Sequence, residues 1–223
     1  MYNGGYMKFK TILTLALTFL VSMAIFADGE LKSIALPKAN IKSASLSDAL
    51  TKRKSTREFN ADKEISLQDL SNILWAAAGI NRPATGQQKA GRTYPSAKNL
   101  QSVSVYVARK DGIYRYDHVK NSLEPVAAGD FRAKTGAQSF AATAPINLIY
   151  VSDVSEFSGS LAVKREYAAF DIGHCSENVY LYCAIANLGT VIRASIDGDA
   201  VAKILKLGKN SIVIAGQSIG HFK

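Results

Sequence analysis

The chain has 223 residues, 48% of them hydrophobic, and a formal net charge of +9. This length is sufficient for one domain with a substantial hydrophobic core. The basic residues are spread along the chain without the basic stripe or interleaved aromatic residues of a nucleic-acid-binding protein, so no nucleic-acid partner is expected. An anionic small molecule or an acidic surface partner is compatible with this charge.

The first 27 residues have the pattern of a secretory signal peptide. Lys8 and Lys10 precede an apolar run from residue 11 to the small residue Ala27. The run of about 17 residues is marginal for a membrane span. We therefore expect residues 1–27 to be a signal peptide, with an uncleaved anchor as the alternative. Cleavage gives an exported protein, periplasmic or extracellular, without stable membrane association. It removes two of the 27 basic residues and none of the 18 acidic ones, which leaves a basic surplus of seven.

An irregular N-terminal arm is expected for residues 28–44, and two helices are expected after it. Each helix opens with a Ser-x-x-Asp pattern, in which the serine hydroxyl accepts a hydrogen bond from the backbone N–H three residues later. The first helix is short and ends near Lys52, and the second ends at Gly79. The two patterns are Ser45-x-x-Asp48 and Ser66-x-x-Asp69.

A hairpin is predicted in the middle of the chain. Residues 81–92 form a polar loop that is long for a compact domain, and such loops are often functional. Alternating valines from Ser102 to Arg109 then lead through Asp111-Gly112 into Ile113-Tyr-Arg-Tyr116. This pattern predicts two antiparallel strands joined by a turn.

The second half of the chain alternates helices with strands. Its longest element is an expected helix from Ala162 to Leu188, apolar around much of its circumference and therefore central or part of an oligomer interface. Cys175 and Cys183 lie about 12 Å apart along this helix, too far for a disulfide, so buried free thiols are expected. The mixed order favours an α+β domain. The other expected elements are a helix at 130–143, a strand at 145–151, a strand at 190–196, a helix at 197–207 and a strand at 211–215.

One segment has the residue types that bind a phosphate. Arg53, Ser55 and Arg57 alternate, and on extended backbone alternate side chains point to the same side. Arginine offers a planar fork of donors to a phosphate, and a serine hydroxyl can donate to another oxygen. A regular helix would turn the serine away from the arginines, so the motif requires a helix end or a loop. A solvated surface stretch is the alternative.

A second segment, Pro95-Ser96-Ala97-Lys98-Asn99, lies just before the Val103 strand. Proline fixes its own φ and lacks a backbone donor, while serine and asparagine offer a hydroxyl and a carboxamide. Such a segment can lie along the edge of a flat heterocycle, or it can be an ordinary turn. The three histidines show no metal-ligand spacing, and no Gly-rich nucleotide loop or Gly-x-Ser-x-Gly motif is present.

In this order, the two segments resemble the FMN-dependent nitroreductase family, in a branch related to azoline-oxidising (SagB-type) dehydrogenases. The family has Arg-x-Ser-x-Arg, then Pro-Ser-x-x-Asn before a strand, then Asp-x-Gly and Asn in a long helix that ends in Leu-Gly-Thr. The resemblance covers about residues 45–223. The matching residues are Arg53, Ser55, Arg57, Pro95, Ser96, Asn99, Asp171, Gly173, Asn178 and Leu188-Gly189-Thr190.

The resemblance implies an α+β, nitroreductase-like three-layer sandwich, with a central, mostly antiparallel sheet flanked by helices. It also implies a homodimer, FMN as the cofactor, and no metal. The flavin domain would span residues 45–223, after the signal peptide 1–27 and the arm 28–44.

Site residues follow by position from the same resemblance. Arg53, Ser55 and Arg57 would hold the ribityl phosphate, and the turn Arg193-Ala194-Ser195 would lie near the reactive edge of the ring. Ala194-Ser195 departs from the Gly pair or Glu-Gly that the family often has there. Lys223 is the late basic candidate for the phosphate. The isoalloxazine would be lined across the dimer interface by Pro95, Ser96, Ala97 and Asn99.

The resemblance implies hydride transfer between flavin N5 and a small acceptor such as a nitroaromatic or a quinone, with NAD(P)H as a candidate donor. This chemistry requires no separate catalytic base, so no catalytic side chain is assigned. Two alternatives stay open. One is a flavin-dependent dehydrogenase of a peptide or small molecule, and the other is a non-catalytic flavin-binding module, which the changed Ala194-Ser195 turn favours.

Overall fold

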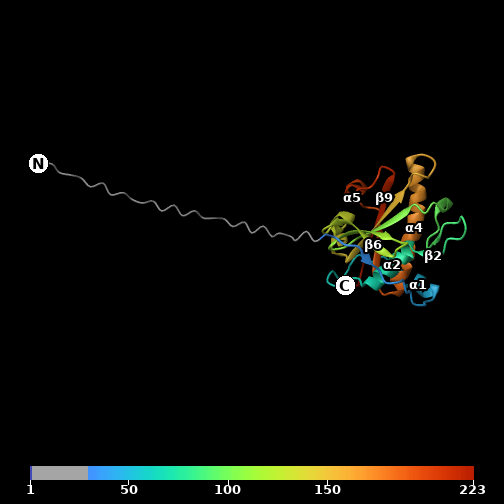
Figure 1. Cartoon of the computed structure of the whole chain (residues 1–223). Helices are drawn as coiled ribbons and strands as arrows, with labels where there is room; N and C mark the ends of the chain where they lie inside the picture. The colour runs from blue at the N-terminus through green and yellow to red at the C-terminus, as the bar shows by residue number, and fades with distance from the viewer. Residues whose placement is uncertain (2–29) are drawn as a thin grey trace.

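The computed structural model describes Met1 and residues 30–223, and residues 2–27 of the predicted signal peptide lie outside the described residues. The middle layer is a seven-stranded antiparallel sheet in the order β1-β6-β5-β4-β7-β9-β8 (Figure 1). Helices cover both of its faces, so the α+β three-layer architecture is confirmed. The strands are β1 Ile34–Ala35, β4 Val103–Ala108, β5 Gly112–Asp117, β6 Ser122–Ala128, β7 Ile146–Asp153, β8 Gly189–Arg193 and β9 Ser211–Gly220.

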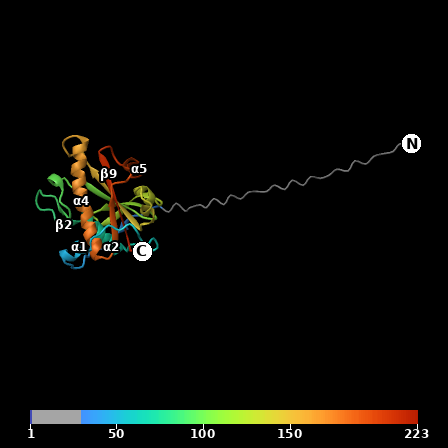
Figure 2. The same cartoon turned by 180° about the vertical axis from the view of Figure 1, so that it is seen from behind.

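The helices fall into two outer layers, and α4 is the longest element of the molecule, as Figure 2 shows from behind. A separate two-stranded hairpin, β2–β3, lies beside this domain. The α-helices are α1 Leu46–Lys52, α2 Leu67–Ala78, α3 Phe140–Thr143, α4 Leu161–Ile185 and α5 Gly198–Ile204. The short 3-10 helices are η1 Ala97–Asn99 and η2 Arg132–Thr135, and the hairpin strands are β2 Ile80–Arg82 and β3 Gly91–Arg92.

The two faces of the sheet bury different clusters, because side chains alternate along each strand. On one face, Val105 and Val107 of β4 pack with α2 and α4, where Leu74 and Ile172 are almost fully buried. On the other face, Tyr106 of the same strand packs in the cluster that includes α5. The central strands are therefore covered on both sides.

The predicted helix caps are present. The Ser45 hydroxyl accepts from the Asp48 N–H at the start of α1, and the Ser66 hydroxyl accepts from the Asp69 N–H at the start of α2. The long helix α4 ends earlier than predicted, since Asn187 adopts a left-handed φ of 56°. The next N–H, of Leu188, donates to the Cys183 carbonyl at 2.9 Å, which closes the helix end.

The helix predicted at 130–143 is wrong. The segment forms η2 and α3, separated at Gly136, which is extended with φ 178° and ψ 157°. A Cβ at Gly136 would overlap the Arg193 guanidinium, so the chain passes this side chain in an extended form. Helical periodicity in the sequence could not reveal a contact with a residue 57 positions later.

Other boundaries also differ from the prediction. β6, which contains Pro125, was not predicted, and the polar loop at 81–92 closes on itself as the β2–β3 hairpin. β9 continues to Gly220, while β8 stops at Arg193. Both cysteines are free and buried, as expected.

Two kinds of feature are absent from the described residues. Within residues 30–223 no helix has the length and apolar character to cross a membrane. The same part of the chain holds no group of three or more histidine, cysteine or carboxylate side chains arranged to bind a metal ion.

Candidate functional site

The Arg53–Arg57 segment begins where α1 ends. Arg53 is the C-cap of α1, with φ −57° and ψ 122°, so the motif leaves the helix and continues in extended form. Ser55 forms a parallel bridge with Thr190, and the Thr56 N–H donates to the Thr190 carbonyl at 2.9 Å. The segment therefore lies along the free edge of β8, and the predicted requirement for a helix end is confirmed.

Tyr180 of α4 packs against the 53–57 segment and contacts two of its residues. Its hydroxyl lies 2.9 Å from Ser55 Oγ and accepts the Ile192 N–H at 3.0 Å. The Arg53 guanidinium lies 5.4 Å from the centre of the Tyr180 ring, a cation–π distance. One buried tyrosine thus connects α4, the edge strand and two members of the predicted phosphate motif.

A cavity of about 480 Å³ opens beside the same tyrosine. Lys54 and Thr190 line it together with Lys52, and the Lys54 ammonium lies 5.1 Å from the centre of the Phe222 ring. Lys223 follows Phe222 directly, so the C-terminus ends next to this cavity. Arg57 is exposed and extends the row of cations along the same segment.

The Pro95–Asn99 segment is held by a different residue of α4. The buried carboxylate of Asp171 accepts hydrogen bonds from Ser96 Oγ and from the Ala97 N–H, both at 2.9 Å. Ser96 Oγ in turn accepts the Gln101 N–H at 2.8 Å. Ser96, which the sequence assigned to flavin, therefore also stabilises the 95–99 turn through these hydrogen bonds.

The turn holds three non-glycine residues in a left-handed conformation. Lys98, Asn99 and Gln101 have φ values of 52°, 53° and 56°. Such values are uncommon for residues with a side chain, and they cluster at functional sites where surrounding bonds hold the backbone in place. Asn99 is exposed and its side-chain oxygen accepts from the Gln101 amide, while Pro95 is exposed beside it.

The Arg193 side chain, from the third predicted segment 193–195, does not point toward the 53–57 segment. Arg193 is buried on the sheet face opposite α4, where its guanidinium donates to the Thr135 carbonyl, Asn147 Oδ1 and Ser218 Oγ. Burial lowers the pKa of Arg193 to about 10. The arginine therefore packs the interior under Gly136, and only Ala194 and Ser195 of this turn are exposed.

The two α4 contacts lie on opposite sides of the helix. Asp171 and Tyr180 are nine residues apart, which corresponds to about 13.5 Å of rise and about half a turn of rotation. The 95–99 turn and the 53–57 segment thus pack against opposite faces of α4. Within one chain, α4 separates the two segments that the sequence assigned to one cofactor.

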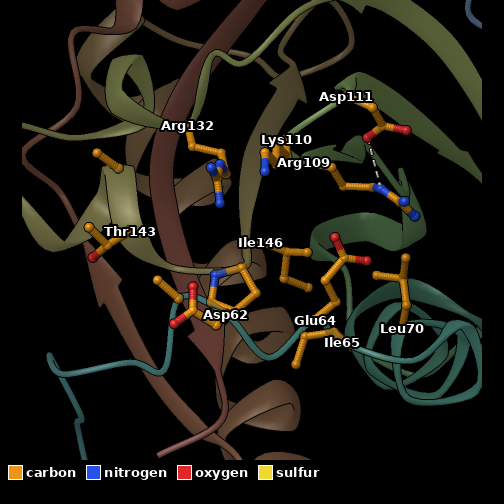
Figure 3. Close-up of a pocket in the computed structure, with 13 residues that line it drawn as sticks. Asp62, Glu64, Ile65, Leu70, Arg109, Lys110, Asp111, Arg132, Thr143 and Ile146 are labelled. Carbon is orange, nitrogen blue, oxygen red and sulfur yellow. Dashed lines mark hydrogen bonds and ion pairs between the residues drawn. The ribbon is translucent and has the colours of Figure 1, made fainter. Parts of the chain in front are cut away.

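A second cavity lies in a different part of the molecule. It has a volume of about 640 Å³, and its lining includes Glu64, Lys110 and Arg132, whose side chains point into it (Figure 3). Arg132 is paired with Asp130 at 2.7 Å, which lowers the pKa of that carboxyl. None of the site residues predicted from the sequence lines this cavity.

Two residues that complete the site were given no role by the sequence. Tyr180 was not singled out, and Asp171 entered only through the family pattern. A carboxylate and a hydroxyl on the buried face of a helix both need hydrogen-bond partners, and that requirement was the available signal. The partners themselves are 75 and 125 residues away in sequence.

The fold and these segments define an α+β domain that presents cations and hydroxyls at the edge of its sheet. The protein-family model of the nitroreductase family matches residues 50–221 of the sequence. The chain therefore belongs to the nitroreductase family. Its class, an FMN-dependent oxidoreductase, agrees with the expectation from the sequence.

Individual relatives agree with this assignment. The chain is 28% identical over 197 residues to a Methanocaldococcus jannaschii protein described as a candidate nitroreductase, covering 83% of this chain and 96% of the relative. A crystal structure described as a candidate nitroreductase from Ralstonia eutropha is 38% identical, with a TM-score of 0.78, covering 86% of this chain and 90% of that one. The Escherichia coli microcin synthetase McbBCD complex has a chain with a TM-score of 0.62 at 18% identity, covering 97% of this chain and 85% of that one, which shows the fold alone.

The residues present fit one end of FMN. A phosphate dianion suits a segment with two arginines, a lysine and a serine hydroxyl, because charge-assisted hydrogen bonds from guanidinium groups are strong and directional. Arg53 and Ser55 are already held on a common support by Tyr180. The 95–99 turn, which is expected to contact the ring, lies on the other side of α4 from the 53–57 segment.

Proposed function

We propose that this protein is an exported, homodimeric enzyme that transfers hydride between FMN and a small acceptor such as a nitroaromatic or a quinone. The observation that carries the proposal is the placement of Arg53 and Ser55 on Tyr180, beside a cavity lined by lysines. Export is supported by the signal-like pattern of residues 1–27.

In this proposal the chain binds and orients while the cofactor reacts. FMN, when bound, supplies the hydride chemistry. Arg53, Ser55 and Arg57 hold its phosphate, with Lys54 and Lys223 adding positive charge nearby. The fixed turn at 95–99 lines the ring from the partner subunit, and exposed backbone at Ala194-Ser195 is available at the edge of the ring.

The outer surface of α4 supports a homodimer. Val163, Tyr167 and Phe170 follow one another at helical spacing on its exposed side, and Phe170 is 68% exposed. This apolar stripe lies between the face that carries Asp171 and the face that carries Tyr180. We propose that a second copy packs on this stripe and that the 95–99 turn of the partner subunit completes the site next to the 53–57 segment.

The electron donor is part of the same proposal, and NAD(P)H is the donor proposed for assays. The alternative is a flavin-dependent dehydrogenase of a peptide or small molecule, as in the branch related to azoline-oxidising dehydrogenases. Anaerobic tests of donors against bound flavin would identify which reduction occurs.

The central test is a pair of double variants with the same change in net charge. Arg53→Ala/Arg57→Ala removes both guanidinium groups from the proposed phosphate site. Lys203→Ala/Lys209→Ala removes two exposed cations on or after α5, in the opposite layer. We expect the arginine variant to lose FMN retention, by about 100-fold in Kd for two charge-assisted contacts, while the lysine variant keeps it.

Flavin absorbance after purification and fluorescence titration with FMN give the result, and a thermal melt checks that both variants fold. Full FMN occupancy in the folded arginine variant would show that the phosphate binds elsewhere. A wild-type protein that is colourless and also does not bind added FMN would refute both the proposed enzyme and the alternative of a flavin-binding module.

A further inference from the structure

We infer that Tyr180 is a positioning residue that makes this site selective for a phosphorylated flavin over an unphosphorylated one. The inference rests on the proposed function and adds a role for a residue outside the family motif. Tyr180 is 6% exposed, and it contacts both Arg53 and Ser55 from below. Its role is to orient these two groups, since the side chain itself lies beneath the segment.

The hydroxyl of Tyr180 is held in place from the opposite direction. It accepts the N–H of Ile192, which is on the free edge of β8, at 3.0 Å. An oxygen that accepts this bond still has its own hydrogen and a second lone pair for Ser55 Oγ at 2.9 Å. The serine hydroxyl is therefore fixed through the tyrosine to the backbone of the sheet. Without that support Ser55 and Arg53 would lie on an exposed segment with rotamer freedom, and their ordering would weaken phosphate binding.

In this inference Arg53 and Ser55, oriented by Tyr180, contact the phosphate group of the ligand and no other part of it. Riboflavin has the same ring and ribityl chain as FMN but lacks the phosphate. Removing the Tyr180 hydroxyl should therefore weaken FMN and leave riboflavin unchanged. A general loss of folding or of the ring site would weaken both ligands to the same extent, so the ratio of the two Kd values separates positioning from structural damage.

Tyr182 provides a matched control on the same helix. It is also 6% exposed, and its hydroxyl has two partners, donating to Asp69 at 2.9 Å and accepting from Asn72 at 3.0 Å. These bonds connect α4 to α2, away from the 53–57 segment. Tyr182→Phe thus removes an equally buried, equally bonded hydroxyl without touching the proposed phosphate site.

The experiment titrates FMN and riboflavin separately into the flavin-free wild type, Tyr180→Phe, Tyr182→Phe, Ser55→Ala and the Ser55→Ala/Tyr180→Phe double variant. We expect Tyr180→Phe to raise the Kd for FMN about tenfold and that for riboflavin less than about twofold, as expected from losing one oriented hydrogen-bonding group. Tyr182→Phe should leave both unchanged. Tyr180→Phe keeps the ring against Arg53 and removes the hydroxyl that contacts Ser55. The double variant should therefore bind FMN no more weakly than Ser55→Ala alone.

Each other outcome overturns the inference. These are an unchanged FMN Kd in Tyr180→Phe, an equal loss for both flavins, and additive losses in the double variant. If Tyr180→Phe does not fold, Ser55→Ala still tests the idea, because it leaves the bond between Tyr180 and Ile192 intact. An FMN Kd that Ser55→Ala does not change would then rule out the proposed orientation. A wild type that binds neither flavin refutes the proposed function itself, which is a distinct result.

Discussion

Near its C-terminal end α4 holds the 53–57 segment through a neutral tyrosine, whereas in its middle it holds the 95–99 turn through a carboxylate. Tyr180 leaves the charges of Arg53 and Lys54 available to an anion. Asp171 instead directs its charge into the turn, where Ser96 and Ala97 use both of its oxygens. The Tyr180 contact leaves a positive charge free to bind an anion, and the Asp171 contact fixes the backbone of the 95–99 turn. These two roles are the ones expected of the proposed phosphate site and of the proposed surface for a flat ring.

The largest expected effect tests whether these two halves come from different subunits. Arg53→Ala/Arg57→Ala damages one half, and Pro95→Trp, at an exposed position, blocks the other. Neither variant alone should retain FMN. When the two are co-expressed with different tags and the mixed dimer is purified, one of its two sites is intact, so about one FMN per two chains is expected.

Flavin absorbance against protein concentration measures that stoichiometry. The matched control is the mixed dimer of wild type with the arginine variant, which also keeps one intact site. Mixed dimers of the two variants that contain no flavin would mean that a single chain supplies both halves, and the half turn between Asp171 and Tyr180 would then need another explanation.

The second effect concerns the stability of the turn. Asp171→Ala leaves the Ser96 hydroxyl and the Ala97 N–H without their acceptor, and the left-handed residues after them lose the bonds that hold them. We expect a loss of about 3 kcal/mol in the free energy of unfolding, the order for two hydrogen bonds to a charged group. Asp171→Asn, which keeps one acceptor oxygen, should lose less.

Urea unfolding measures both variants, and Asp199→Ala, an exposed carboxylate in the first turn of α5, is the control with the same loss of charge. A cost for Asp171→Ala no larger than the control would show that the turn is stable without α4. The 95–99 turn would then keep its shape without its contact to α4, and Asp171 would have no structural role comparable to that of Tyr180.

The sequence predicted the local features of this arrangement better than the long-range ones. The caps at Ser45 and Ser66 and the end of α1 before Arg53 depend on residues within three or four positions, so they could be read directly. Gly136 adopts its extended form because Arg193 packs against it, and no local pattern reports that contact. The separation by α4 of the two segments that the sequence assigned to flavin likewise depends on long-range contacts. It follows from the rotation between Asp171 and Tyr180, whose partners are far away in sequence.

The smallest expected effect uses the two cysteines as local probes. Cys175 lies one turn after Asp171, and Cys183 lies about one turn after Tyr180. Both thiols are buried, and burial raises the pKa of each, so native labelling at pH 8 should be slow. The labelling rate of each thiol therefore reports how often its own part of α4 opens.

In proteins that keep only one cysteine, Asp171→Ala should accelerate the labelling of Cys175 about tenfold and that of Cys183 less than about twofold, because opening is local. Tyr180→Phe should show the reverse preference. Labelling in denaturant, where both thiols react alike, is the reference for intrinsic reactivity. If each variant accelerates both thiols by the same factor, α4 opens as one unit, and the two halves of the site are coupled through the helix that separates them.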